Sequence, residues 1–172
     1  MPSIGARLGV SHSGLYRYIT NRQDLVVQAF GRIAREASWP STDQPWRDQL
    51  IGIGETLWTI CGTYPGYDLA AVTTRNISPG FAQALTPYVD SMTAQGLDIV
   101  DATAAIDFVR TAVITSSIDA ARLRSVVDLP DVPEHSIPAY ADPEKWDGRS
   151  WYQRHLDIYL AGLAQRVRAN SA

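Results

Sequence analysis

Apolar side chains recur along most of this chain with the 3.6-residue spacing of an amphipathic helix. The longest example extends from position 98 to about 127, where small or apolar residues share one face at positions 102, 106, 109, 113, 117 and 120. The same spacing predicts helices at 3–8, 12–19, 21–38, 45–63, 68–75, 79–94 and 151–167. The β-branched stretches 71–74 and 113–117 are the weakest helical segments, but they are too short or too embedded to begin a sheet. The pattern therefore predicts an all-α chain.

Residues that favour turns and helix ends support these boundaries. Gly9 has no Cβ and suits the left-handed conformation that closes a helix. Asn21 is followed three residues later by Asp24, a variant of the capping box that begins a helix. Pro87 is expected to bend or interrupt the helix 79–94. The acidic, proline-rich segment 128–147 is predicted to be a loop.

The first of these segments have the pattern of a helix-turn-helix unit. Apolar residues at positions 4, 8, 10, 15 and 19 can close over a small core, and Gly9 makes the turn. Ser11 caps the second helix, whose positive N-terminal end can face a phosphate or the major groove. The residues left outside this core are polar or aromatic, as contacts to the DNA backbone and base edges require.

Charge is distributed unevenly along the chain. The first 35 residues contain five arginines and one acidic residue, which gives them a net charge of +4. The whole chain has a net charge of −3, so the remainder carries −7. A basic head on an acidic body is typical of a protein with one phosphate-binding end.

Three successive motifs resemble one known family. They are Leu8-Gly9-Val10-Ser11, then Leu15-Tyr16-Arg17-Tyr18-Ile19, then Asn21-Arg22-Gln23-Asp24-Leu25. Their order and spacing are similar to the DNA-binding head of the TetR (tetracycline-repressor-like) family of transcriptional regulators. More weakly, the segment 151–164 resembles the closing helix of that family, an aromatic residue followed by Leu-Asp-x-x-Leu-x-Gly-Leu.

The resemblance implies a recognition helix at 12–18 and a set of DNA-contacting residues. These are Ser11, His12, Ser13, Tyr16, Arg17, Tyr18 and Arg22. His12, Ser13 and Arg17 would lie nearest the base edges, and the two tyrosines would lie toward the phosphates. Arg22 occupies the position where the family usually has a phosphate-contacting lysine. Alternatively, the tyrosines are half-buried packing residues and Arg22 is a solvated charge.

The same resemblance implies two domains, partners and an incomplete head. A helix-turn-helix head with its connecting helix would occupy 1–37, and a helical bundle for effector binding and dimerisation would occupy 38–172. A homodimer would form through helices 101–124 and 151–167, where small residues allow close approach, namely Ala112, Ser116, Ser117 and Ala120. The family has a further helix before Ser3, so this head is expected to lack its first helix and to bind operator DNA weakly.

Members of the family bind a small-molecule effector inside the second domain. The candidate lining residues are aromatic, apolar or hydroxyl-bearing: Trp58, Cys61, Tyr64, Tyr67, Phe81, Tyr88, Met92, Phe108 and Thr111. These residue types would make an ordinary core equally well. Because the set contains no cation, the expected effector is largely apolar and uncharged, unless Arg75 or Arg110 faces inward.

Little in the sequence favours an enzyme. The three histidines are scattered, and no Ser-His-acid, Cys-His or paired-carboxylate arrangement has usable spacing. The Gly-x-Gly at 52–54 lies in a helical pattern without the strand that precedes a dinucleotide site. Cys61 has no nearby metal-ligand partner and is expected to pack as a small apolar residue. We therefore expect neither metal nor cofactor.

The predicted function is that of a ligand-responsive transcriptional regulator, most simply a repressor. The chain has no apolar stretch long enough to span a membrane and no secretion leader, so a cytoplasmic location is expected. One alternative is a dimeric small-molecule-binding or interaction protein without DNA binding. An all-helical enzyme is a further, less favoured alternative.

Overall fold

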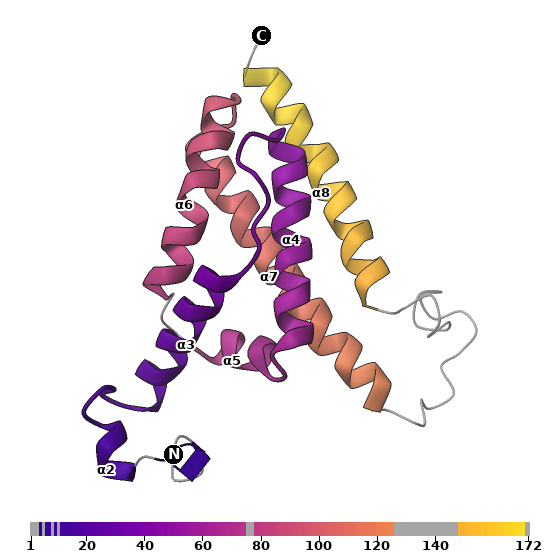
Figure 1. The fold of residues 1–172 in the computed structure, drawn as a ribbon. Coiled ribbons are helices and arrows are strands. Elements are labelled where there is room, and N and C mark those ends of the chain that lie inside the picture. The colour runs from indigo at the N-terminus through magenta and orange to yellow at the C-terminus, as the bar shows by residue number, and fades with distance from the viewer. Residues whose placement is uncertain are drawn as a thin grey trace.

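The computed structural model describes residues 4, 6–7, 9, 11–74, 78–125 and 148–170. These ranges contain helices and no strand, which confirms the all-α prediction. The helices are α2 (His12–Leu15), α3 (Arg22–Glu36), α4 (Trp46–Thr63), α5 (Tyr67–Thr73), α6 (Pro79–Ala94), α7 (Ile99–Ser125) and α8 (Arg149–Asn170). Figure 1 shows α4, α7 and α8 close together in the body, while α3 leads from it toward α2 at the end of the molecule far from the C-terminus.

The longer helices follow the apolar periodicity closely, and α6 has the predicted bounds. It continues from Pro79 to Ala94 through Pro87, so that proline does not interrupt the helix. Pro87 lies on the exposed face of α6, where water can satisfy a carbonyl that a proline leaves without a partner. The predicted loop at 128–147 lies outside the described residues. So does half of the predicted helix 3–8, of which Ile4, Ala6 and Arg7 are described and helical.

The second predicted helix is shorter than expected. It ends at Leu15, and residues 16–18 form a turn instead of continuing the helix to position 19. The reason lies in α3, whose side chains bond the backbone just after this turn. Gln28 Nε2 donates to the Tyr18 carbonyl at 3.3 Å, and the Thr20 amide donates to the Asp24 carboxylate at 2.7 Å. These hydrogen bonds hold residues 18–20 in a non-helical conformation that leads directly into α3.

The caps predicted from local sequence are confirmed. Gly9 has a positive φ of 67°, and the Gly14 amide donates to Ser11 Oγ at 3.0 Å at the start of α2. The Asp24 amide donates to Asn21 Oδ1 at 2.9 Å, which is the first bond of a capping box, whereas the Asp24 carboxylate accepts from the amide of Thr20 in place of that of Asn21. The hydrogen bond from the Thr20 amide lowers the pKa of the Asp24 carboxyl, and the hydrogen bond from the Gln28 side chain lowers it further.

The core forms around one face of α4, which packs against α7 and α8. Its fully or nearly fully buried residues include Leu50, Ile53 and Leu57 of α4, Val109 and Val113 of α7, and Tyr152 and Leu160 of α8. Gly54 allows the Tyr152 ring to reach α4, because a Cβ at position 54 would overlap the Tyr152 hydroxyl oxygen. The Gly-x-Gly at 52–54 therefore serves helix packing.

Two further glycines bring α3 and α6 into direct contact. A Cβ on Gly80 would lie 2.8 Å from the Gly31 Cα and 2.9 Å from the Gly31 carbonyl oxygen. Such distances leave no room for a side chain, so the two backbones touch where the helices cross. This crossing fixes α3 against the body. Among the described helices, none has the length and apolar character needed to cross a membrane.

Candidate functional site

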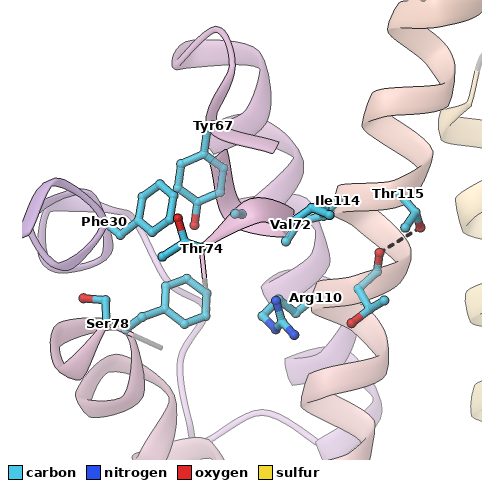
Figure 2. Close-up of a pocket in the computed structure, with 11 residues that line it drawn as sticks. Phe30, Tyr67, Val72, Thr74, Ser78, Arg110, Ile114 and Thr115 are labelled. Carbon is cyan, nitrogen blue, oxygen red and sulfur yellow. Dashed lines mark hydrogen bonds between the residues drawn. The ribbon is translucent and has the colours of Figure 1, made fainter. Parts of the chain in front are cut away.

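A cavity of about 400 Å³ lies between α3, α5, α6 and α7 (Figure 2). This volume is within the range of small-molecule sites, roughly 300–1,000 Å³. The described residues that line it are Phe30 of α3, Tyr67, Ala71, Val72 and Thr74 in and after α5, Ser78 and Phe81 at the start of α6, and Arg110, Thr111, Ile114 and Thr115 of α7. Two other hollows lie between α3 and α4 and between α3 and α5, and in each of them at least half of the lining residues are exposed.

Aromatic rings form the wall of the cavity on the side of α3 and α6. The Phe30 and Tyr67 rings lie 4.7 Å apart between centroids, tilted by 57°. Phe81 is buried and meets Trp39 edge-on, at 5.9 Å and 80°. Trp39 is itself fixed, because its indole Nε1 donates to the Ala34 carbonyl at 2.7 Å. The wall is therefore held by packing on both sides before any ligand binds.

The α7 side of the cavity carries Arg110, the one charged residue among the described lining residues. Arg110 donates from Nε and Nη2 to the same oxygen of Asp107, at 3.2 and 2.8 Å. The Ser117 hydroxyl donates to the Asp68 carboxylate at 3.0 Å and so connects α5 to α7. The Arg110 side chain is 33% exposed and that of Asp107 is 65% exposed, so the carboxylate lies on the solvent side of the pair.

The Tyr67 hydroxyl is kept protonated. Burial raises its pKa to about 12, the neighbouring Cys61 adds to the shift, and Arg110 opposes it. At neutral pH the group is therefore a neutral hydroxyl that can donate a hydrogen bond. Figure 2 shows Tyr67 above the space into which Arg110 reaches from α7.

Three of the residues predicted to bind an effector line this cavity, namely Tyr67, Phe81 and Thr111. The structure places the other six elsewhere. Trp58 stacks on Tyr152 with ring centroids 5.9 Å apart, and Phe108 stacks on Tyr159 at 4.0 Å. The Tyr88 hydroxyl donates to the Pro40 carbonyl. Met92 and Cys61 are buried in the core, and Tyr64 is exposed after α4.

Sequence reasoning missed several lining residues. Phe30 was counted as part of the connecting helix of the head, and Val72 and Ile114 carried no sign beyond helical periodicity. Arg110 could be suspected from the sequence, because an arginine at this position would favour a charged effector if it faced inward, and it does line the cavity. Arg75, the other candidate, lies outside the described residues.

The predicted DNA-contacting residues lie on the surface of the head. Ser11, Ser13, Tyr16, Arg17 and Arg22 are exposed, and Tyr18 is 81% exposed. The His12 side chain lies outside the described part of the structure. The alternative, in which Tyr18 is a half-buried packing residue, does not hold, because this ring lies at the surface. Figure 1 places these residues at the end of the molecule far from α8's C-terminus.

The predicted dimerisation helices have different exposed faces. Ile158 of α8 is 64% exposed, next to the exposed Ala161 and Gly162. On α7, by contrast, two of the small residues expected at the interface are used within the chain. A Cβ on Gly148 would overlap the Ala120 Cβ and lie 2.9 Å from the Ser116 carbonyl oxygen, so the start of α8 packs there.

No protein-family model matches the chain, and no curated protein is similar to it in sequence. The structure nevertheless resembles crystal structures of the Streptomyces coelicolor TetR family protein ActR. In complex with actinorhodin, ActR is 20% identical to this chain, with a TM-score of 0.75 over 97% of this chain and 87% of that one. For apo ActR the identity is 20% and the TM-score 0.74, over 95% and 85% of the two chains. For ActR with (S)-DNPA they are 18% and 0.70, over 96% and 86%.

These likenesses show that the chain has the fold of TetR family proteins, a helical head followed by a helical bundle. The fold expected from the three sequence motifs is therefore confirmed.

Proposed function

We propose that this chain is a ligand-responsive transcriptional regulator of the TetR type. It binds operator DNA as a homodimer through the head, residues 1–37. It is released by a small molecule in the cavity that the body, residues 38–172, forms together with Phe30 of α3. The role is regulatory and not catalytic. The TetR-type fold supports this proposal, as do the crystal structures of ActR with a bound small molecule.

One observation carries the proposal: Phe30 belongs both to the cavity wall and to α3. The N-terminal end of α3 is bonded to the turn after α2 through Asp24 and Gln28. A ligand in the cavity would therefore contact the same rigid helix that carries the head. A ligand that contacts Phe30 better in one position of α3 shifts the population toward that position. The coupling between cavity and head then needs no further moving part.

The DNA-binding half of the proposal has a direct test. Selection of bound duplexes from a random pool gives the preferred sequence, and fluorescence anisotropy then compares that sequence with a random duplex. Arg17→Ala is expected to reduce the preference by about 1–3 kcal/mol, because a base contact carries sequence information. Arg22→Ala is expected to weaken binding to both duplexes about equally and to reduce the salt dependence, because a phosphate contact carries none.

Arg168→Ala provides the control, since this exposed arginine lies near the end of α8, far from the head (Figure 1). Equal loss of preference in the Arg17 and Arg22 variants would contradict the assigned roles. Absence of any DNA binding at low salt would instead favour a ligand-binding protein without a DNA partner.

The homodimer is proposed to form through the exposed faces of α7 and α8, with Ile158 at the contact. Sedimentation at micromolar concentration should show a dimer. Ile158→Glu should produce a folded monomer, because it places a charge in an apolar interface. A wild-type monomer, or a dimer that Ile158→Glu leaves intact, would contradict this interface.

A further inference from the structure

The cavity contains a positively charged side chain, and none of its other described lining residues carries the opposite charge. Arg110 is the one charged residue among the described residues that line it. A guanidinium in an otherwise apolar and hydroxyl-bearing cavity is costly unless a partner compensates the loss of hydration. Its partner Asp107 is mostly exposed, and ion pairs with such a carboxylate contribute little. The cavity therefore contains a partly exposed guanidinium whose charge none of the other described lining residues neutralises.

The bonding of Arg110 leaves donors available. An arginine has five N–H groups. Asp107 accepts from Nε and from Nη2 through a single oxygen, Oδ1. Within the described residues, Nη1 has no hydrogen-bond partner. The Asp107 pair thus holds the guanidinium in place by one edge and leaves N–H groups for an acceptor in the cavity.

The side of the cavity opposite Arg110 favours the flat apolar part of a ligand. The Phe30 and Tyr67 rings and the buried Phe81 line that side, and Val72 and Ile114 add aliphatic surface. Figure 2 shows Arg110 reaching from α7 into the space between that helix and the aromatic rings. An aromatic ligand that fills this space would place one edge near Arg110. Because apolar walls lower the local dielectric constant, an ion pair there is stronger than one at the surface.

We propose that the cavity takes an aromatic ligand carrying an anionic group, with the rings against Phe30, Tyr67 and Phe81 and the anion on Arg110. The Tyr67 hydroxyl donates a second hydrogen bond to the same group. This inference rests on the proposed function, since it names the ligand class of the same cavity. It replaces the largely uncharged effector expected from sequence with an anionic one.

Two fluorescent probes test the charge requirement. Anilinonaphthalene sulfonate has the aromatic skeleton and an anion, whereas N-phenylnaphthylamine has the same skeleton without it. Arg110→Met retains length and apolar contact and removes the charge. It should weaken the sulfonate by about tenfold or more, as loss of a charge-assisted hydrogen bond predicts, and change the neutral probe by less than about twofold. Arg110→Lys should restore part of the sulfonate affinity, since it restores the charge without the fork of donors.

A matched control and a blocking variant make the result specific. Arg32 also pairs with a carboxylate on its own helix, but it is exposed and outside the cavity, so Arg32→Met should leave both probes unchanged. Val72 is exposed and lines the cavity, so Val72→Trp should fold and should weaken both probes by occupying the space. Circular dichroism and melting temperatures verify that each variant is folded.

The outcomes separate the two proposals. If Val72→Trp weakens both probes but Arg110→Met affects them equally or not at all, the anionic ligand class is wrong while the ligand-binding cavity stands. If Val72→Trp affects neither probe, the cavity does not bind aromatic ligands, and both the ligand class and the ligand half of the proposed function are overturned. The DNA-binding half is decided independently by the Arg17 and Arg22 variants.

Discussion

Replacement of Tyr152 by phenylalanine should make the protein more stable. The side chain is 1% exposed, and its hydroxyl has no hydrogen-bond partner among the described residues. It lies directly against Gly54 of α4, where a Cβ would overlap the hydroxyl oxygen and would lie 2.9 Å from the ring carbon that carries it. Burial raises the pKa of this phenol, so the group is neutral, but its polar atom remains desolvated.

The expected magnitude follows from that desolvation. A buried polar group without a partner costs about 1–3 kcal/mol, so Tyr152→Phe should increase the free energy of unfolding by a similar amount. For a chain of this size each kcal/mol corresponds to roughly 2–4 °C in melting temperature. Gly54→Ala should have the opposite effect, about 1–3 kcal/mol of destabilisation, because the added methyl group overpacks a filled interface.

A double-mutant cycle tests the geometry that underlies both numbers. In the Tyr152→Phe background the new Cβ at position 54 no longer meets an oxygen, so Gly54→Ala should cost less by about 1 kcal/mol or more. Urea unfolding of the four proteins gives the coupling energy. Tyr159→Phe is the matched control on the same helix, because Tyr159 is only half-buried, and its effect should stay within about 0.5 kcal/mol. Destabilisation by Tyr152→Phe, or a coupling energy of zero, would refute the reasoning.

Three other measurements concern features elsewhere in the chain. Gly80→Ala should lower the free energy of unfolding by about 1–3 kcal/mol, because its Cβ meets backbone, whereas Gly62→Ala, which has open space in α4, should raise it by about 0.5–1 kcal/mol. Asp24 has a lowered pKa in the folded state, so its stabilising contribution is present above its unfolded pKa and is lost as the pH falls through the folded value. An Asp24→Asn variant should therefore be less stable than wild type near pH 7 but not in strong acid. In the wild-type protein the NMR resonance of the Thr20 amide should shift as Asp24 titrates, because the two groups are hydrogen-bonded. A Thr20 resonance that does not change in acid would contradict this hydrogen bond. Burial raises the pKa of the Cys61 thiol to about 11. An aromatic disulfide reagent at mildly alkaline pH should therefore react slowly with Cys61 in the folded protein and rapidly in guanidinium. Fast reaction of the folded protein would show that the thiol is accessible.

Local chemistry explains which parts of the fold could be predicted from sequence. The buried faces of α4 and α7 and the caps at Ser11 and Asn21 depend on residues a few positions apart, and these predictions were confirmed. The bounds of α6 were also predicted, although the expected interruption at Pro87 does not occur because that position faces solvent. The end of α2 was predicted wrongly, because side chains of α3 hold the backbone after the turn. That contact is not visible in the local pattern.

The candidate site was harder to predict for a related reason. Trp58 and Phe108 have the same character as Tyr67 and Phe81, but they stack on rings of α8 and not on the cavity. Which aromatic residue meets which partner depends on the rotation of each helix and on contacts between distant segments. Phe30 was overlooked because sequence alone does not show that α3 reaches the body.

The direct contact between Gly31 and Gly80 restricts how this cavity can be adapted to a new ligand. Neither position has a side chain to exchange, and any addition at Gly80 would push the α3 and α6 backbones apart. The walls that α5 and α7 provide can change without disturbing this crossing, and there Val72 and Thr111 are exposed at the edge of the cavity. A library of variants confined to α5 and α7 would change the ligand selectivity of the cavity. Every variant would keep the contact between Gly31 and Gly80 that positions α3.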